Sequence, residues 1–212
     1  MVRRKRYRWS ANLAYAIGLI ATDGSLSKDG RHIDLTSKDL EQLQNFAKIL
    51  SLNNKISSKS SSYNPQGLYW HIAFGNVIFY RFLLKIGLTP AKSKTIGAIL
   101  IPDKYFADFL RGSLDGDGYT YSYWDPRWRS SFSLYTGFVS ASLKHLEWIS
   151  DQVERLYELR GKIKFSARAY SLVYAKKASV ALLNKIYYKK GLICLTRKSS
   201  KINIALSIIS KA

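Results

Sequence analysis

The sequence predicts an α+β protein made of two pseudo-symmetric repeats, each with a four-stranded antiparallel sheet covered by helices. Three observations predict it. Apolar residues at helix spacing and short alternating strands follow one another in the order helix-strand-strand-helix-strand-strand-helix. This order occurs twice, and a proline-bounded linker separates the two copies. We therefore divide the chain into a first repeat (residues 10–88), a linker (89–102) and a second repeat (103–212).

The first repeat is expected to begin with a helix at residues 12–22, whose apolar positions recur at helix spacing. A hairpin signal, Lys28-Asp29-Gly30, then joins two short strands. The elements expected after the first helix are strands at 25–28 and 32–36, a helix at 38–50, strands at 55–60 and 68–74 around a turn at 63–67, and a helix at 77–86.

The second repeat restarts the same order with a helix at residues 104–116. The expected elements that follow are strands at 119–123 and 131–139, a helix at 143–159, strands at 162–168 and 172–176, and a helix at 178–189. The strands alternate, so one face packs under helices while the other carries polar, basic and aromatic groups. The side chains expected on the covered face are Trp70, Ile72, Phe74, Phe132, Leu134, Thr136, Ile163 and Phe165.

The charge balance indicates the partner. Lys and Arg number 34 against 14 Asp and Glu, a formal net charge of +20. Self-repulsion on this scale destabilises a fold unless a polyanion uses the field, and charge spread along the whole chain favours nucleic acid over a membrane surface. An apolar content of 47% excludes a disordered basic tail. The single cysteine, Cys194, excludes a disulfide framework and a Cys-based zinc site. Neither a membrane span nor a signal peptide is predicted.

Small residues recur every four positions in the first helix of each repeat. They are Ala14, Gly18 and Thr22 in one, and Gly112 and Gly116 in the other. Spacing by four places them on one helical face, where missing side chains let two helices approach closely. We therefore expect these two helices to pack against each other.

Each of these helices is followed by an Asp-Gly pair, Asp23-Gly24 and Asp117-Gly118. If the helices pack, the two carboxylates meet at the same end, where they repel each other and face the negative end of each helix dipole. A divalent cation would offset both costs, and oxygen-only ligands favour Mg²⁺ over zinc. The alternative is that each Asp-Gly pair forms only a turn. A calcium-binding loop starting at Asp115 does not fit the spacing.

Residues 16–24 and 110–118 resemble the nine-residue motif of the LAGLIDADG homing endonucleases, in the single-chain form with two repeats. The positions that match are Gly18, Leu19, Ile20, Asp23 and Gly24 in the first copy, and Leu110, Gly112, Asp115, Asp117 and Gly118 in the second. The resemblance implies a monomeric, site-specific endonuclease that hydrolyses one phosphodiester on each strand of double-stranded DNA with Mg²⁺, for which Mn²⁺ substitutes. It also implies that the two sheets form a saddle over the DNA and that Asp23 and Asp117 bind the metal.

Basic residues near each scissile phosphate are also implied by the resemblance. Lys38 follows the second strand of the first repeat and has no lysine counterpart in the second. Lys92 and Lys198 follow the third helix of each repeat at corresponding positions. We take all three as candidate catalytic residues that stabilise charge on the phosphate. As ordinary surface lysines of a basic protein they would have no such role.

The polar sheet faces are the candidate DNA-binding surface, because antiparallel strands can lie in the major groove. The residues expected to contact DNA are Lys28, Arg31, His32, Lys59, Tyr69, His71, Tyr121, Arg129, Ser131, Ser133, Tyr135, Lys162, Lys164 and Arg168. The alternative for these faces is a solvated surface.

Three classes of function fit the sequence to different degrees. The leading hypothesis is an intron-encoded homing endonuclease without an obligate protein partner, acting in a prokaryotic cytoplasm or a eukaryotic organelle. The second is an RNA maturase that binds its intron RNA, or a regulator that binds nucleic acid without cleaving it. The paired Asp23 and Asp117 favour cleavage, because binding alone does not require paired acids. A ribosome-associated basic protein would explain the charge but not the two motifs.

Overall fold

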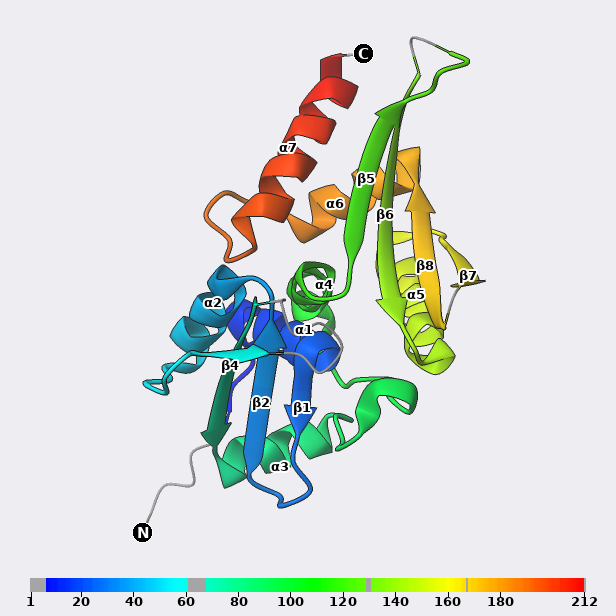
Figure 1. Ribbon diagram of the computed structural model, residues 1–212. Helices are drawn as coiled ribbons and strands as arrows, with labels where there is room; N and C mark the ends of the chain where they lie inside the picture. The colour runs from blue at the N-terminus through cyan, green and yellow to red at the C-terminus, as the bar shows by residue number, and fades with distance from the viewer. Residues whose placement is uncertain (1–6, 61–67, 129–130, 167, 212) are drawn as a thin grey trace.

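The computed structural model describes residues 7–60, 68–128, 131–166 and 168–211, and only the backbone of Lys59 and Ser60. It confirms the predicted fold class, an α+β protein with two four-stranded antiparallel sheets (Figure 1). The expected turn at residues 63–67 lies outside the described residues. None of the helices in the described part of the chain is long and apolar enough to cross a lipid bilayer.

The first repeat follows the expected order closely. Ser10 caps the first helix by accepting a hydrogen bond from the Leu13 amide, and Asn76 caps the third through the Phe79 amide. The elements are α1 (Ala11–Asp23), β1 (Gly24–Leu26), β2 (His32–Ser37), α2 (Leu40–Leu50), β3 (Ser57–Ser60), β4 (Leu68–Gly75) and α3 (Val77–Lys85).

The second repeat has the same order and one further helix that the sequence patterns did not predict, α7 (Thr196–Lys211). Two short 3₁₀ turns, Lys92–Lys94 and Asp103–Tyr105, lie in the chain between α3 and α4. The other elements are α4 (Phe106–Asp115), β5 (Tyr119–Trp124), β6 (Phe132–Ser140), α5 (Leu143–Tyr157), β7 (Lys162–Ser166), β8 (Ala169–Ala175) and α6 (Lys176–Ile186).

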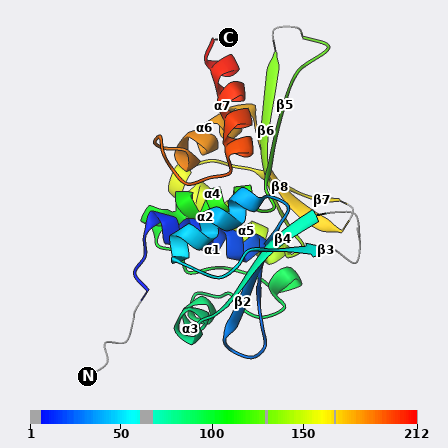
Figure 2. The same ribbon diagram turned by 60° about the vertical axis from the view of Figure 1, so that its left-hand side comes forward.

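The two sheets have equivalent strand orders, β1-β2-β4-β3 and β5-β6-β8-β7. Helices α2 and α3 pack on the first sheet, and α5 and α6 pack on the second. The two halves lie on either side of α1 and α4, which cross at the centre of the molecule (Figures 1 and 2). The β5–β6 hairpin is long, and α7 lies alongside it (Figure 1).

Contact between α1 and α4 depends on the small residues, as the sequence predicts. A Cβ atom added to Gly18 would lie 2.3 Å from the Phe109 carbonyl oxygen, and one added to Gly112 would lie 2.1 Å from that of Tyr15. Backbone atoms cannot give way to such a clash, so these glycines are required by the close approach.

The covered faces hold the expected residues with one exception. Ile72, Leu134 and Thr136 are buried, but Phe165 is 66% exposed, so its expected burial is wrong. The reason is its strand, because β7 is the edge of the sheet, beyond the central strands on which α5 and α6 pack. Phe165 instead packs against Tyr170 of β8, with ring centroids 4.8 Å apart.

Candidate catalytic site and nucleic-acid interface

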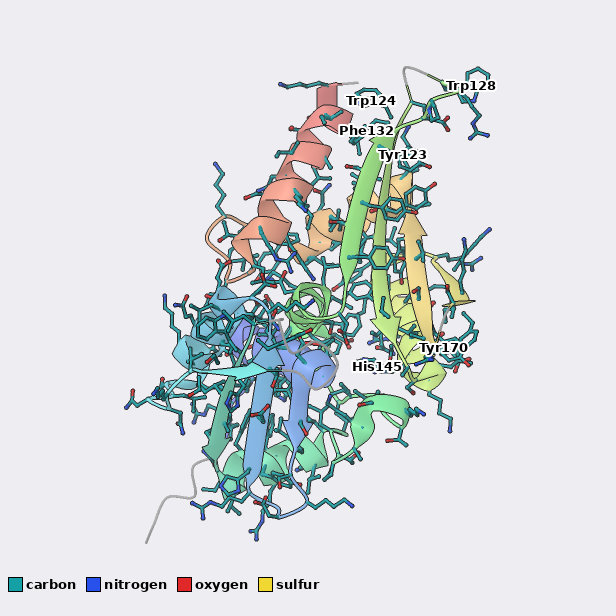
Figure 3. The ribbon with its side chains drawn as sticks, in the orientation of Figure 1. Tyr123, Trp124, Trp128, Phe132, His145 and Tyr170 are labelled. Carbon is teal, nitrogen blue, oxygen red and sulfur yellow. The ribbon has the colours of Figure 1, made fainter. Side chains whose placement is uncertain are left out.

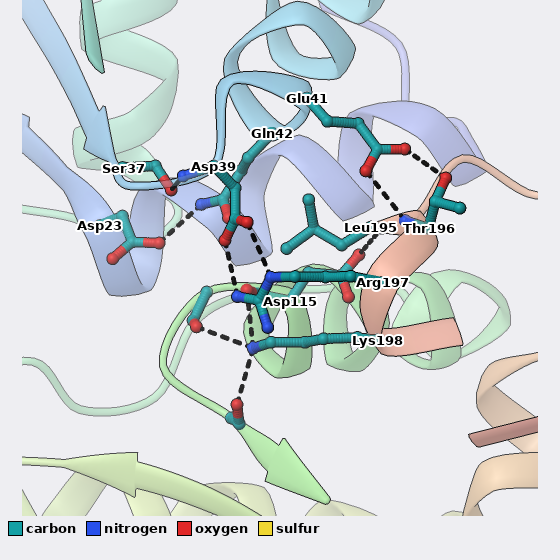
Figure 4. Close-up of polar contacts among 12 residues, drawn as sticks. Asp23, Ser37, Asp39, Glu41, Gln42, Asp115, Leu195, Thr196, Arg197 and Lys198 are labelled. Carbon is teal, nitrogen blue, oxygen red and sulfur yellow. Dashed lines mark hydrogen bonds and ion pairs between the residues drawn. The ribbon is translucent and has the colours of Figure 1, made fainter. Parts of the chain in front are cut away.

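Asp23 and Asp117 lie at the same end of the crossed helices. Asp23 is the last residue of α1, and Asp117 follows the end of α4 by two residues. The Gln42 side-chain amide donates a 2.6 Å hydrogen bond to Asp23 Oδ2 (Figure 4). A Cβ atom on Gly116 would stand 3.0 Å from that oxygen, so the absence of a side chain there leaves room for the carboxylate.

The two carboxylates are unfavourable as anions in this setting. Desolvation, reinforced by the negative charge of Asp117, raises the pKa of Asp23 to about 6. Desolvation by surrounding atoms also raises the pKa of Asp117, although its side chain opens to solvent. Lys92 and Lys198 act in the opposite direction on both groups. Four charged side chains from both repeats therefore share one electrostatic environment.

The donor set fits a hard divalent cation. In the described ranges, no three His, Cys, Asp or Glu side chains gather as a closed metal site. Two carboxylates from facing helix ends, with coordination left for water and phosphate, suit the way Mg²⁺ binds proteins. Asp23 and Asp117 are the residues that would hold the ion.

Lys92 lines a cavity of about 130 Å³ together with Asp117, Ser113 and Ser140. Its side chain is 5% exposed, and burial lowers the pKa of its ammonium group to about 8. It therefore remains mostly protonated at pH 7, and its positive charge faces the Asp117 end of the site. This placement suits the catalytic role expected for Lys92.

Lys198 occupies a different setting from its counterpart. Its ammonium group donates to the carbonyl oxygens of Leu114, Asp115, Gly116 and Gly118, at 2.6, 2.8, 3.1 and 2.7 Å. These carbonyls form the end of α4 and the turn around Asp117, so Lys198 is a side-chain cap on that helix terminus.

Lys38 lies apart from the acid pair. Its side chain is exposed, and its ammonium group is 5.3 Å from the ring centroid of Tyr69. Among the described residues, Lys38 forms no ion pair with Asp23 or Asp117. It therefore belongs to the sheet surface in this structure.

Asp115 points into the core and not toward the other acids. Its Oδ2 accepts hydrogen bonds of 2.8 Å from the Tyr15 hydroxyl and the Leu195 amide. Burial raises the pKa of its carboxyl to about 6. Asp115 therefore ties α4 to α1 and to the chain after α6.

Gln42 and residues 194–197 were not expected from the sequence. Figure 4 shows this segment close to both motif helices and to the start of α2. Arg197 pairs with Asp39, and the Thr196 amide donates to Glu41. No sequence pattern marks such contacts, since they join residues that are 155 and 158 positions apart.

The face of the first sheet opposite its helices carries paired polar groups. His71 Nδ1 lies 2.9 Å from Asp34 Oδ2, and the Thr36 hydroxyl donates a 2.8 Å hydrogen bond to Asp34 Oδ1. Asp29 contacts His32 beside the β1–β2 turn. The Asp34 carboxylate thus fixes the ring of His71 and leaves its Nε2 for a ligand.

The same face of the second sheet carries a stack of tyrosines. The rings of Tyr121 and Tyr135 are 4.8 Å apart and nearly parallel, and Tyr119 and Tyr123 continue the stack at 6.0 and 6.3 Å from Tyr121. Figure 3 shows Tyr123 on the long hairpin, below Trp124 and Phe132 near its tip. Lys164 is exposed at the outer strand of the same face.

The structure brings most predicted DNA-binding residues to these two faces or their rims. Lys28, Arg31 and His32 lie at the β1–β2 turn, Tyr69 and His71 on β4, Tyr121 on β5, Ser131, Ser133 and Tyr135 on or beside β6, Lys162 and Lys164 on β7, and Arg168 at the β7–β8 turn. Lys59 is placed on β3 by its backbone, and Arg129 lies outside the described residues.

A family model described as LAGLIDADG-like domain matches residues 10–87. The chain carries a LAGLIDADG-like domain. This finding and the structural matches confirm the resemblance drawn from the two motifs. No curated protein matches the sequence.

Solved structures share the two-repeat LAGLIDADG fold. The homing endonuclease I-WcaI bound to its DNA recognition sequence has a TM-score of 0.64 at 12% identity, covering 92% of this chain and 88% of that one. A structure of variants of the homing endonuclease I-DmoI has a TM-score of 0.58 at 14% identity, covering 91% of this chain and 97% of that one. I-DmoI was also solved in complex with DNA and Ca.

The fold also occurs in full-length DUF199/WhiA from Thermatoga maritima, with a TM-score of 0.60 at 15% identity. That match covers 96% of this chain but 62% of the other, so this chain spans less than two thirds of that protein. At these identities the matches establish the fold alone.

Proposed function

We propose that this LAGLIDADG protein is an intron-encoded, site-specific endonuclease that hydrolyses one phosphodiester in each strand of double-stranded DNA. The observation that carries the proposal is the convergence of Asp23 and Asp117 beside Lys92 and Lys198. Binding alone gains nothing from two acids that repel each other, whereas a site for a divalent cation requires them. Mg²⁺ is the proposed cofactor, with Mn²⁺ as a substitute.

Each side chain has a role that follows from its contacts. Gln42 orients the Asp23 carboxylate, and Lys198 fixes the turn that carries Asp117. Lys92, protonated and facing the cavity beside Asp117, would bind a phosphate oxygen and offset the charge that develops there. The bound cation would supply activation of water and stabilisation of the leaving oxygen.

The two sheet faces supply affinity and specificity. Basic groups at their rims would neutralise phosphates, and the central polar and tyrosine side chains would contact base edges. Because one chain contains both repeats, we propose that the protein acts as a monomer on a long asymmetric target.

A second candidate is a maturase or regulator that binds nucleic acid without cutting it. The observation in its favour is the fold itself, which I-DmoI, a homing endonuclease, and DUF199/WhiA share. The acid pair distinguishes the candidates, because the second predicts that Asp23 and Asp117 can be neutralised without loss of function.

A randomised duplex library tests the proposal and identifies the target sequence in the same experiment. The library is incubated with the protein and Mg²⁺, and both the cut ends and the duplexes that stay bound to the protein are sequenced. We expect one asymmetric consensus with breaks in both strands from wild-type protein, and none from Asp117→Asn. The matched control is Glu154→Gln, which removes an exposed carboxylate paired with Arg160 on α5, the helix on the covered side of the second sheet. A consensus that is bound but never cut by wild-type protein would support the second candidate.

A further inference from the structure

Residues 194–198, which we call the clasp, connect the end of α4 with the start of α2 (Figure 4). We propose that the clasp positions Asp23 and Asp117 relative to each other, so that the chain after α6 sets the geometry of the cation site. The inference rests on the proposed function in assigning a cation to these two acids. Polar contacts join the clasp to the turn that carries Asp117 on one side and to the first turn of α2, which holds Asp23, on the other.

On the second repeat, the clasp binds the turn that carries Asp117. The Leu195 amide donates to the buried carboxylate of Asp115 at 2.8 Å. The Lys198 ammonium group donates to carbonyls on both sides of Asp117, those of Gly116 at 3.1 Å and Gly118 at 2.7 Å. A charged donor shared by these carbonyls restricts the backbone on both sides of the acid.

On the first repeat, the clasp binds the N-terminal turn of α2. Arg197 donates two hydrogen bonds to the Asp39 carboxylate, of 2.7 and 2.6 Å, and the Thr196 amide donates to Glu41 at 3.0 Å. Gln42, in the same helical turn, holds Asp23 at 2.6 Å. Any shift of α2 along its axis would therefore move the group that orients Asp23.

The clasp adds directional contacts to those of the helix crossing. Glycine contacts between α1 and α4 fix how close the helices come, and the Tyr15–Asp115 hydrogen bond joins them inside the core. The clasp adds directional bonds at the end where the acids lie. Its Arg197–Asp39 pair is partly exposed, at 53% and 23%, so it contributes little to stability. Loss of this pair should therefore affect the site more than the fold.

Arg197→Gln tests the inference, and Arg155→Gln is its control. Arg155 makes the same two-bond pair, with Asp103 at 2.8 and 2.5 Å, and its side chain is 49% exposed against 53% for Arg197. Three quantities are measured on the full chain: Ca²⁺ affinity by calorimetry, the thermal unfolding midpoint, and hydrogen exchange of residues 111–118. Asp39→Asn provides a second variant that breaks the same pair from the other side.

We expect Arg197→Gln and Asp39→Asn each to weaken Ca²⁺ binding by about fivefold to tenfold, an ordinary coupling within one polar network. The double variant should lose no more than either single one, and Arg155→Gln should stay within about twofold of wild type. Hydrogen exchange at residues 111–118 should be faster than in wild type in Arg197→Gln and unchanged in Arg155→Gln. Equal Ca²⁺ affinity in wild type and Arg197→Gln, even with a lower unfolding midpoint, would overturn the inference.

A wild-type protein that binds neither Ca²⁺ nor Mg²⁺ would refute the proposed function on its own. In that case, hydrogen exchange still tests whether the clasp positions the turn that carries Asp117. Faster exchange at residues 111–118 in Arg197→Gln but not in Arg155→Gln would support it, and unchanged exchange would overturn it.

Discussion

The first sheet presents hydrogen-bonded polar groups on the face away from its helices, whereas the second presents stacked tyrosine rings on the equivalent face. Both sheets have the same strand order and the same antiparallel pairing. A repeated topology fixes where the strands lie but leaves outward side chains free to differ, since these contribute little to the core. We infer that the two halves would contact different halves of a DNA site.

The motif helices α1 and α4 contrast with the sheets, because packing leaves them little freedom. Gly18 and Gly112 each meet the backbone of the other helix, and an acid follows at the same end of both. Close contact at the centre thus constrains both repeats equally. The comparison predicts that changes at the helices act on the whole molecule, while changes at one sheet act on one half of the target.

The largest effect is expected from neutralising either acid. Asp23→Asn and Asp117→Asn should each reduce double-strand cleavage by at least about 10³-fold, because each removes charge that holds the same cation. Affinity for DNA should change by less than about threefold, since phosphate and base contacts lie on the sheets. Cleavage and gel-shift assays on the selected target measure both quantities. A variant of one acid that cuts at the wild-type rate would break the equivalence of the two repeats.

The next largest effect, a loss of stability, is expected from adding a side chain where α1 and α4 cross. Gly112→Ala places a Cβ 2.1 Å from the Tyr15 carbonyl oxygen, so we expect a loss of at least about 3 kcal/mol in the free energy of unfolding. Gly97→Ala is the control, because a Cβ there meets no atom within 4 Å. Urea unfolding of the two variants measures the difference. Equal stability would show that the crossing is looser than these distances imply.

A smaller effect is expected from Asp23 on the pH dependence of stability in the absence of metal. The pKa of Asp23 is about 6 in the folded protein against an ordinary value of 3.8, so its contribution to stability falls as pH rises through this window. Asp23→Asn should therefore be more stable than wild type by about 3 kcal/mol at pH 7.5 in EDTA. The difference should vanish near pH 4. A variant that is less stable at pH 7.5 would contradict the unfavourable burial of the Asp23 carboxylate beside Asp117.

The smallest effects are expected at the sheets. Lys164→Ala should reduce the slope of log K against log salt by about 0.9, from a total near −7 for about 8 phosphate contacts. His71→Ala and Tyr121→Ala should each relax base preference in one half of the selected consensus only, by about 1–3 kcal/mol per affected base pair. Repeated library selection with each variant measures this. A variant with relaxed base preference in both halves of the consensus would refute the claim that each sheet contacts one half of the target.

The sequence predicted those features that depend on local patterns. Periodicity predicted the element order, and small residues at a spacing of four predicted the close packing of α1 against α4. Their corresponding positions in the sequence made Lys92 and Lys198 look equivalent. In the structure, Lys92 lines a cavity, whereas Lys198 donates hydrogen bonds to four backbone carbonyls. Alternation alone could not predict the exposure of Phe165, because it does not identify the edge strand.

Long-range polar contacts could not be predicted from the sequence for a different reason. Arg197 and Asp39 are 158 positions apart, and neither belongs to a motif. Gln42 lies within an ordinary amphipathic helix, where a buried glutamine has no pattern of its own. Such residues are defined by the tertiary arrangement, which brings α2 and the start of α7 to the ends of the motif helices.

Thermal unfolding as a function of Ca²⁺ concentration tests most directly the claim that two repeats build one cation site. The assay needs no target DNA and compares wild type, Asp23→Asn, Asp117→Asn, the double variant and the control Glu154→Gln. We predict that Ca²⁺ raises the unfolding midpoint of wild type and of Glu154→Gln, and that either single Asn variant at the site loses nearly the whole shift. The double variant should lose nothing further, because the two acids act as one unit. Single variants that each keep half of the shift would show two independent sites and contradict the account.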